Sequence, residues 1–222
     1  MFFRTALKNK VHAIFLKNGI NIDFSDIFGK KALEFLKWIP LRSCYRKSLD
    51  GYIKLAKQLN TLIKGVEEVI KEKVEEDPKA LLLTTIPGIS YYSALLIISE
   101  IGDINGFFSS GHLSSYGGLI PSVHSSGGKT RLGRITKRGS KWLRWILVEN
   151  AHHAARGSIR FGNLHKRVAS RHGTRTANVA VAREMLKVIY FMLKRNEPFR
   201  DIKAKQIKDT GHLRGVMTRK RS

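Results

Sequence analysis

The sequence has a single cysteine, few acidic residues and no long run of apolar residues. Cys44 is the only cysteine among 222 residues, which excludes an internal disulfide and a zinc site built on several cysteines. The longest apolar run, residues 91–98, is closed by Glu100 and is far too short to span a bilayer. Basic residues interrupt the apolar N-terminal stretch, so no secretory signal is visible. We therefore expect a cytoplasmic, nucleoid-associated protein with no membrane contact.

Basic residues are in large excess, and most of the excess lies in the second half of the chain. The sequence contains 41 Lys and Arg against 17 Asp and Glu, a formal net charge of +24. Residues 129–222 carry a balance of +20, and residues 1–128 only +4. The positive charges of such a segment repel one another unless a polyanion binds to it. Nucleic acid is therefore the expected partner. Charge alone leaves a ribosome-associated protein as an alternative, and it does not distinguish DNA from RNA as the partner.

The spacing of apolar residues predicts a mainly α fold. Helices are expected over residues 5–16, 27–38, 141–155 and 176–193. The clearest long helix covers residues 48–76, where apolar side chains recur every three or four positions, as they do along the seam of a coiled coil. This pattern predicts a homo-oligomer that associates through the long helix. A helix packed on its own domain is the alternative.

Residues 83–96 have the form of a helix-hairpin-helix motif, in which two short helices flank a tight turn. Gly88 allows that turn, and the second helix begins with unpaired N–H groups and a positive dipole end that can hold a phosphate. Such a contact fixes position on the nucleic-acid backbone without reading its sequence. An ordinary helical hairpin is the alternative. The predicted DNA-binding residues of the turn are Pro87, Gly88, Ile89 and Ser90.

Residues 102–139 are predicted to form a Gly- and Ser-rich loop that ends in a dense basic run. A serine is a poor nucleophile unless a base, a metal or concentrated positive charge activates it. Cations can neutralise a phosphate and stabilise the charge that develops when it is attacked, and glycines permit close approach. Loops of this kind often only wrap a phosphate, so catalysis and simple binding both stay open. The predicted DNA contacts here are Gly127, Gly128, Lys129, Arg131, Arg134, Lys137, Arg138 and Lys141.

Two further groups of residues lie beyond this loop. Trp142 and Trp145 are interpreted as core residues, with base stacking as the alternative. A series of basic residues downstream suits a surface that tracks phosphates of DNA or RNA. These residues are Arg156, Arg160, Lys166, Arg167, Arg171 and Arg175.

An ordered series of motifs closely resembles the C-terminal domain of transposases of the insertion sequence 110 type, with relatives 116 and 902. The motifs are residues 86–89, 101–104, 116–122, 125–129 and 133–139. Weaker similarity at residues 7–13, 28–31 and 179–186 extends the resemblance over nearly the whole chain.

The resemblance implies a DNA recombinase guided by a non-coding RNA, in which a serine attacks the DNA backbone and forms a covalent protein–DNA link. In the family this serine directly precedes a glycine, which places it on Ser126 here. Ser125 is the adjacent alternative and Ser122 a weaker one.

The family couples this serine domain to a RuvC-like domain with acidic metal ligands. We find no such acidic constellation in the sequence, so no metal site and no cofactor are expected in this chain. Mg²⁺ is expected only with a RuvC-like domain in a separate chain. Whether the chain alone is an enzyme is therefore left open.

The resemblance divides the chain into four expected parts. Residues 1–47 are a connecting region after the missing RuvC-like domain, and residues 48–78 a coiled-coil-like helix. Residues 79–199 are a helix-hairpin-helix transposase domain, and residues 200–222 a basic tail. The expected function is a DNA-binding transposition or recombination subunit that supplies a serine nucleophile. The alternative is a non-enzymatic DNA- or RNA-binding protein, such as a truncated transposase.

Overall fold

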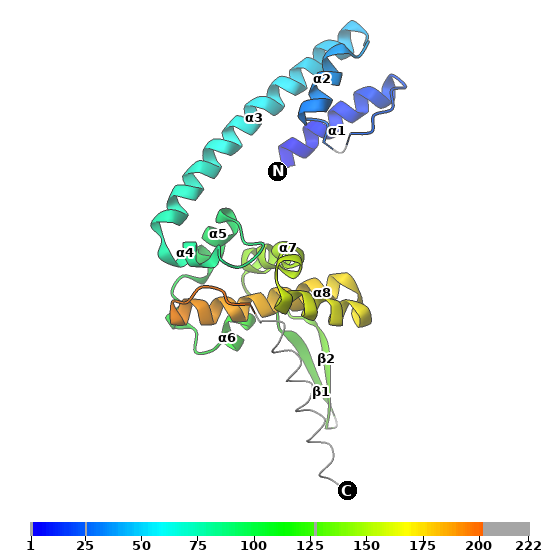
Figure 1. Cartoon of the computed structure of the whole chain (residues 1–222). Helices are drawn as coiled ribbons and strands as arrows, with labels where there is room; N and C mark the ends of the chain where they lie inside the picture. The colour runs from blue at the N-terminus through cyan, green and yellow to red at the C-terminus, as the bar shows by residue number, and fades with distance from the viewer. Residues whose placement is uncertain (1, 25, 127, 202–222) are drawn as a thin grey trace. The chain divides into compact units, whose positions relative to one another are not determined.

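A computed structural model describes residues 2–24, 26–126 and 128–201, and these residues are mainly helical, as predicted (Figure 1). The chain forms two compact units, Met1–Val69 and Ile70–Ser222. The division falls inside the longest helix of the N-terminal half, so each unit is described by itself.

The N-terminal unit consists of α1 (Phe2–Lys17), α2 (Lys30–Trp38) and the part of α3 (Ser43–Glu76) up to Val69. Each helix contributes one apolar face to a shared core, which includes Phe15, Leu36 and Leu49. The Arg46 guanidinium donates hydrogen bonds to the carbonyl oxygens of Leu36 and Ile39, and this satisfies carbonyls at the end of α2.

The apolar residues of α3 are buried towards the two ends of the helix, where Leu49, Ala56 and Val74 are each at most 2% exposed. Leu49 and Ala56 lie in the core of the N-terminal unit. Further along, Leu62, Val66 and Val69 are 68%, 59% and 56% exposed. These three side chains in the middle of α3 are thus exposed to solvent, and association through this helix stays a prediction.

The C-terminal unit packs helices around one core. The helices are α4 (Pro78–Leu83), α5 (Tyr91–Ile101), the 3₁₀ turn η1 (Ile104–Gly106), α6 (Ser110–Tyr116), α7 (Lys141–Gly157) and α8 (Ile159–Arg195). Side-chain oxygens accept hydrogen bonds from the first N–H groups of these helices, which explains where the helices begin. The capping residues are Asp77, Ser90, Asp103, Ser109, Ser140 and Ser158.

The segment predicted as a loop, residues 102–139, contains regular structure instead. It forms η1, α6 and an antiparallel ribbon of β1 (Pro121–Ser126) and β2 (Lys129–Ile135), and the loop prediction is wrong to that extent. Val123–Ser126 are exposed and in Figure 1 the ribbon extends away from the helices. The tip of the ribbon does not cover a core, so its sequence lacks the alternation of apolar and polar residues that predicts a half-buried strand.

Backbone contacts hold the base of the ribbon to the core. The N–H groups of Thr136 and Ser140 donate to the carbonyl oxygens of Ile120 and Tyr116, each at 2.9 Å. Gly139 has φ +102°, and a Cβ there would lie 1.9 Å from the carbonyl oxygen of Tyr116. Only glycine fits at this crossing, so the Gly-rich composition of the segment has a steric cause.

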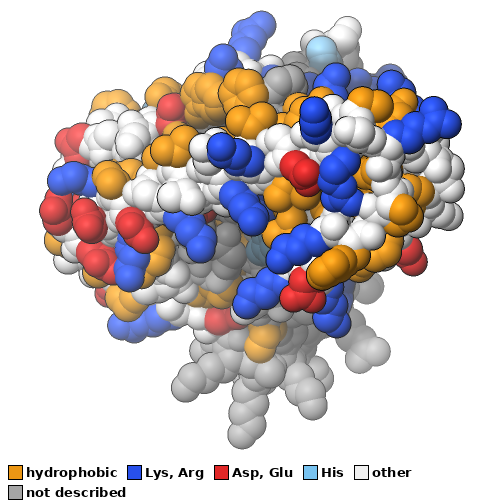
Figure 2. Space-filling model, turned by 90° about the horizontal axis from the view of Figure 1, so that it is seen from above, with side chains coloured by type: hydrophobic (Ala, Val, Ile, Leu, Met, Phe, Trp, Pro, Cys, Tyr) orange, Lys and Arg blue, Asp and Glu red, His pale blue; other side chains and the backbone are white. Residues whose placement is uncertain are grey.

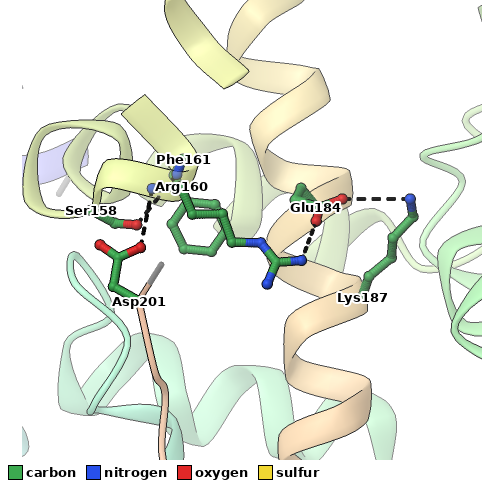
Figure 3. A network of polar contacts seen from close by, with 6 residues as sticks. All are labelled: Ser158, Arg160, Phe161, Glu184, Lys187 and Asp201. Atoms are coloured by element: carbon green, nitrogen blue, oxygen red, sulfur yellow. Dashed lines mark hydrogen bonds and ion pairs between the residues drawn. The ribbon is translucent and has the colours of Figure 1, made fainter. Parts of the chain in front are cut away.

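Helix α8 is broken at Gly173, where φ is 79° and ψ is 164°, into arms of residues 159–172 and 174–195. Arg160 Nη2 contacts Glu184 Oε1 at 2.6 Å (Figure 3). A straight helix would place these residues roughly 36 Å apart, so the two arms must fold back on each other. The sequence predicted only the second arm, because the first has no continuous apolar stripe.

Two side chains cap the start of α8 (Figure 3). Ser158 Oγ accepts the N–H of Phe161 at 3.3 Å. The Asp201 carboxylate accepts the N–H groups of Ile159 and Arg160 at 2.7 and 3.1 Å. The remainder of the predicted basic tail, residues 202–222, lies outside the described residues.

Glu184→Gln tests the ion pairs between the two arms. Burial raises the pKa of Glu184, but Arg160 and Lys187 outweigh it, so the pKa lies below its ordinary value. The ionised carboxylate therefore stabilises the fold above about pH 4.3, and this contribution is lost as pH falls through the lowered pKa. We expect Glu184→Gln to lower the free energy of unfolding by about 1 kcal/mol at neutral pH, with the difference closing in acid.

Urea unfolding between neutral and acidic pH measures this difference. The control is Glu197→Gln, an exposed glutamate with no ion pair among the described residues. A stability difference for Glu184→Gln that stays constant down to the lowest pH would contradict the role of the ion pairs.

Candidate nucleic-acid interface

Ser126 is the last residue of β1 and is exposed at the tip of the ribbon. In the strand register it pairs with Lys129, and Ser125 pairs with Thr130. Gly128, at the turn, has φ +74° with open space around it, which is the conformation that tight hairpin turns require. Gly127, also predicted to bind DNA, lies outside the described residues.

The ribbon brings Ser122 and His124 together. Residues two apart on a strand share a face, so Ser122, His124 and Ser126 point to the same side. Ser122 Oγ lies 3.4 Å from His124 Nε2. On the facing strand, a Cβ at Gly133 would lie 2.4 Å from Ser122 Oγ and 3.3 Å from His124 Nε2. Gly133 therefore leaves the space that these two side chains occupy.

Sequence reasoning missed this contact because it treated the segment as a loop. Recognition of the strand would have revealed it, since an i, i+2 pair is adjacent only in extended backbone. His124, Ser125, Ser126 and Arg131 line a hollow of about 660 Å³ together with Val123.

The described carboxylates do not neutralise the positive charge around the ribbon. The predicted DNA-binding cations whose side chains the structure describes are all exposed, and none forms an ion pair with a described carboxylate. They are Arg131, Arg134, Lys137, Arg138 and Lys141. Figure 2 shows Lys and Arg side chains spread over the visible surface. An array of unpaired cations favours a polyanionic partner.

The turn of residues 87–90 packs directly on α7. Gly88 has φ +87°, and a Cβ there would lie 2.8 Å from both His153 Cβ and the Ala154 nitrogen. A Cβ at Gly157 would lie 2.6 Å from Pro87 Cβ. Two glycines thus allow the turn and the helix to approach more closely than side chains permit.

A pocket of about 700 Å³ opens between this turn and α7. It is lined by Pro87, Gly88, Ile89, Ser90, Asn150, His153, Arg156 and Gly157. The structure therefore brings the four predicted turn residues together with α7. Asn150 is 8% exposed, and its Nδ2 is buried with no hydrogen-bond partner among the described residues. Asn150 and His153 were not predicted, because their position beside the turn follows only from the packing.

The predicted basic surface and the two predicted core tryptophans have different outcomes in the structure. Arg160 is engaged by Glu184, whereas Lys166, Arg167 and Arg171 are exposed on the first arm of α8. Trp142 and Trp145 are 51% and 43% exposed, so their interpretation as core residues is wrong. The face of α7 that enters the core carries smaller apolar residues, Leu143, Ile146 and Leu147.

Within the described ranges, no three His, Cys, Asp or Glu side chains come together where they could hold a metal ion. None of the helices in that part of the chain is both long enough and apolar enough to cross a membrane.

Comparison with known proteins gives consistent matches. Residues 80–167 match the family described as Transposase IS116/IS110/IS902 family. The chain is 28% identical over 211 residues to the transposase for insertion sequence element IS1111A of Coxiella burnetii, a match that covers 89% of this chain and 56% of the relative. It is 29% identical over 199 residues to the transposase for element IS1328 of Yersinia enterocolitica, covering 84% and 57%.

A third relative has a different description. The chain is 34% identical over 128 residues to the pilin gene-inverting protein of Moraxella bovis, covering 56% of this chain and 40% of that protein. The chain spans a little over half the length of the first two relatives.

Gly88→Ala tests the contact between the turn and α7. A methyl group at this positive φ meets the α7 backbone, so we expect a loss of about 2–4 kcal/mol in the free energy of unfolding. Gly106→Ala is the matched control, because nothing lies within 4 Å of its added Cβ. It should change stability by no more than about 0.5 kcal/mol. Thermal unfolding followed by circular dichroism measures both, and equal stability of the two variants would contradict the close contact.

Proposed function

We propose that the chain, whose residues 80–167 match the IS116/IS110/IS902 transposase family, acts on DNA in transposition or recombination. The observation that carries the proposal is the position of Ser126, exposed at the tip of a ribbon whose described cations form no ion pair with a described carboxylate. We assign Ser126 as the nucleophile that joins to DNA. Relatives described as transposases and as a pilin gene-inverting protein support this class of reaction.

The proposed step is an exchange of phosphoesters. Ser126 Oγ attacks the phosphorus of a DNA phosphodiester, an Oγ–P bond forms, and one bond from phosphorus to a deoxyribose oxygen breaks. The serine proton leaves, and the released deoxyribose oxygen takes up a proton. One phosphodiester replaces another, so the bond energy is retained and attack by a different DNA hydroxyl can rejoin the strands.

The neighbours of Ser126 suit this step. His124 lies on the same face two residues earlier, about 7 Å along the strand, and can receive the serine proton directly or through one water. Arg131 lines the same hollow and can stabilise the negative charge that develops on the phosphate. Ser125 lines the same hollow and is the competing nucleophile, and Ser122 is further from the tip.

The pocket between the turn and α7 is proposed to anchor the DNA backbone away from the reacting phosphate. The start of α5 presents N–H groups and a positive dipole end, and Arg156 adds a full charge at the pocket wall. Such contacts position DNA without reading its sequence, which leaves target choice to other groups.

Arg156→Gln tests this anchoring. Each neutralised phosphate contributes about −0.9 to the slope of log K against log salt concentration for duplex DNA. We expect Arg156→Gln to weaken duplex binding and to reduce the slope by about 0.9, because one phosphate contact is lost. Lys17→Gln removes an exposed cation from the N-terminal unit and serves as the control. An unchanged slope for Arg156→Gln would remove this pocket from the DNA-binding surface.

Ser126→Ala tests the nucleophile. The wild-type chain is incubated with a RuvC-like domain supplied as a separate chain, Mg²⁺, duplex carrying the ends of its element and the non-coding RNA of that element. We expect it to form an adduct that survives denaturing electrophoresis. Ser126→Ala should abolish the adduct and leave DNA affinity intact, because the hydroxyl acts in bond formation. Ser125→Ala is the matched control and should retain the adduct. Mass spectrometry of the adduct identifies the modified residue.

The other outcomes are equally informative. An adduct on Ser125 or Ser122 would overturn the assignment of Ser126. Tight DNA binding with no adduct on any serine would favour a non-enzymatic DNA-binding protein.

A further inference from the structure

Two tryptophans at the start of α7 present their rings to solvent. Trp142 and Trp145 are three positions apart and therefore share one face of the helix. Their ring centroids are 6.1 Å apart, and the ring planes meet at 83°. The Lys141 ammonium lies 5.3 Å from the centre of the Trp142 ring. No ring of another described residue stacks on this pair.

Exposure of two large rings side by side is unusual on a protein surface and marks a place of contact. The charge of the surrounding segment indicates the kind of partner. Residues 129–148 contain seven Lys and Arg and no Asp or Glu. A second copy of this chain would bring the same cations to the contact and be repelled, whereas nucleic acid offers both phosphates and flat aromatic bases.

We propose that Trp142 and Trp145 form a stacking site for unpaired nucleobases, with the phosphates of the same strand held by Lys137, Arg138 and Lys141. Bases within a duplex stack on each other, so only an unpaired, mismatched or extruded base exposes a face to a tryptophan. The pair follows the end of β2 by seven residues, at the base of the ribbon that carries Ser126.

This inference rests on the proposed function, because strand exchange requires bases to separate from their paired bases. The site would hold a displaced strand close to the element that carries the serine. Stacking tolerates any base, because every base has a flat face, so the site would not select a sequence.

Tryptophan fluorescence provides the first test. The only other tryptophan of the sequence is Trp38, which is 86% exposed in the N-terminal unit. In the Trp38→Phe variant, all tryptophan emission therefore comes from Trp142 and Trp145. We expect oligothymidylate to quench the emission of this variant. An abasic oligomer of equal length and charge should bind through its phosphates without comparable quenching. Equal quenching by both oligomers would show that bases do not stack on the pair, and the proposal would fall.

Affinity measurements with substituted chains provide the second test. Trp142→Leu should weaken binding of oligothymidylate about tenfold, since one stacking contact is lost, while the affinity for duplex stays nearly unchanged. Trp142→Phe keeps an aromatic face and should retain most of the affinity. Trp38→Leu is the matched control, an exposed tryptophan outside the site. Because both of the substituted tryptophans are at least half exposed, the fold should tolerate all three substitutions.

Three results distinguish failure of the stacking site from failure of the proposed function. Equal effects of Trp142→Leu on single strand and duplex would overturn the stacking site. A change of sedimentation on Trp142→Leu, without a change in oligothymidylate binding, would show a protein contact in its place. Failure of the wild-type chain to bind duplex at all would count against the proposed function, and it is recorded independently of the single-strand result.

Discussion

Close contact between backbone segments, made possible by glycine, positions both the turn of residues 87–90 and the base of the ribbon in the C-terminal unit. At Gly88 the turn of residues 87–90 meets the α7 backbone, and at Gly139 the base of the ribbon meets the carbonyl of Tyr116. Both glycines also adopt a positive φ, so a side chain would be strained as well as obstructed. Between these two contacts runs α7, which carries the wall of the pocket towards its end and the tryptophan pair at its start.

The same unit tolerates a large uncompensated charge because it keeps that charge away from its core. The cations of the ribbon are exposed on a two-stranded extension, where water screens their mutual repulsion. Carboxylates are used where two parts of the fold must be joined, as between Arg160 and Glu184. Stability and nucleic-acid binding therefore draw on separate sets of charges, and salt should affect binding more than folding.

The sequence predicted those parts of the fold that bury a regular apolar face. The long helix α3 and the helix α7 follow from three- and four-residue spacing, and the turn at Gly88 follows from its Pro-Gly pair. The ribbon and the first arm of α8 escaped prediction because both bury few side chains; in that arm Phe161 is the only buried apolar residue. Exposed elements of this kind leave little periodicity to detect.

The candidate site was predictable to a similar extent. The serines and cations were identified from motif and charge, whereas the Ser122–His124 contact needed knowledge of the strand. Asn150 beside the turn and the exposure of Trp142 depend on how α7 packs, and no local pattern encodes that orientation.

The caps of the longer helices have a consequence for where an anion can settle. The start of α8 already holds the Asp201 carboxylate, and Ser140 at the start of α7 donates to Glu100 at 2.6 Å. Helix α5 differs, since its cap is the uncharged hydroxyl of Ser90. Of the three longest helices of the C-terminal unit, α7 and α8 thus have a carboxylate close to their first turn, and only α5 leaves its positive end to an incoming phosphate.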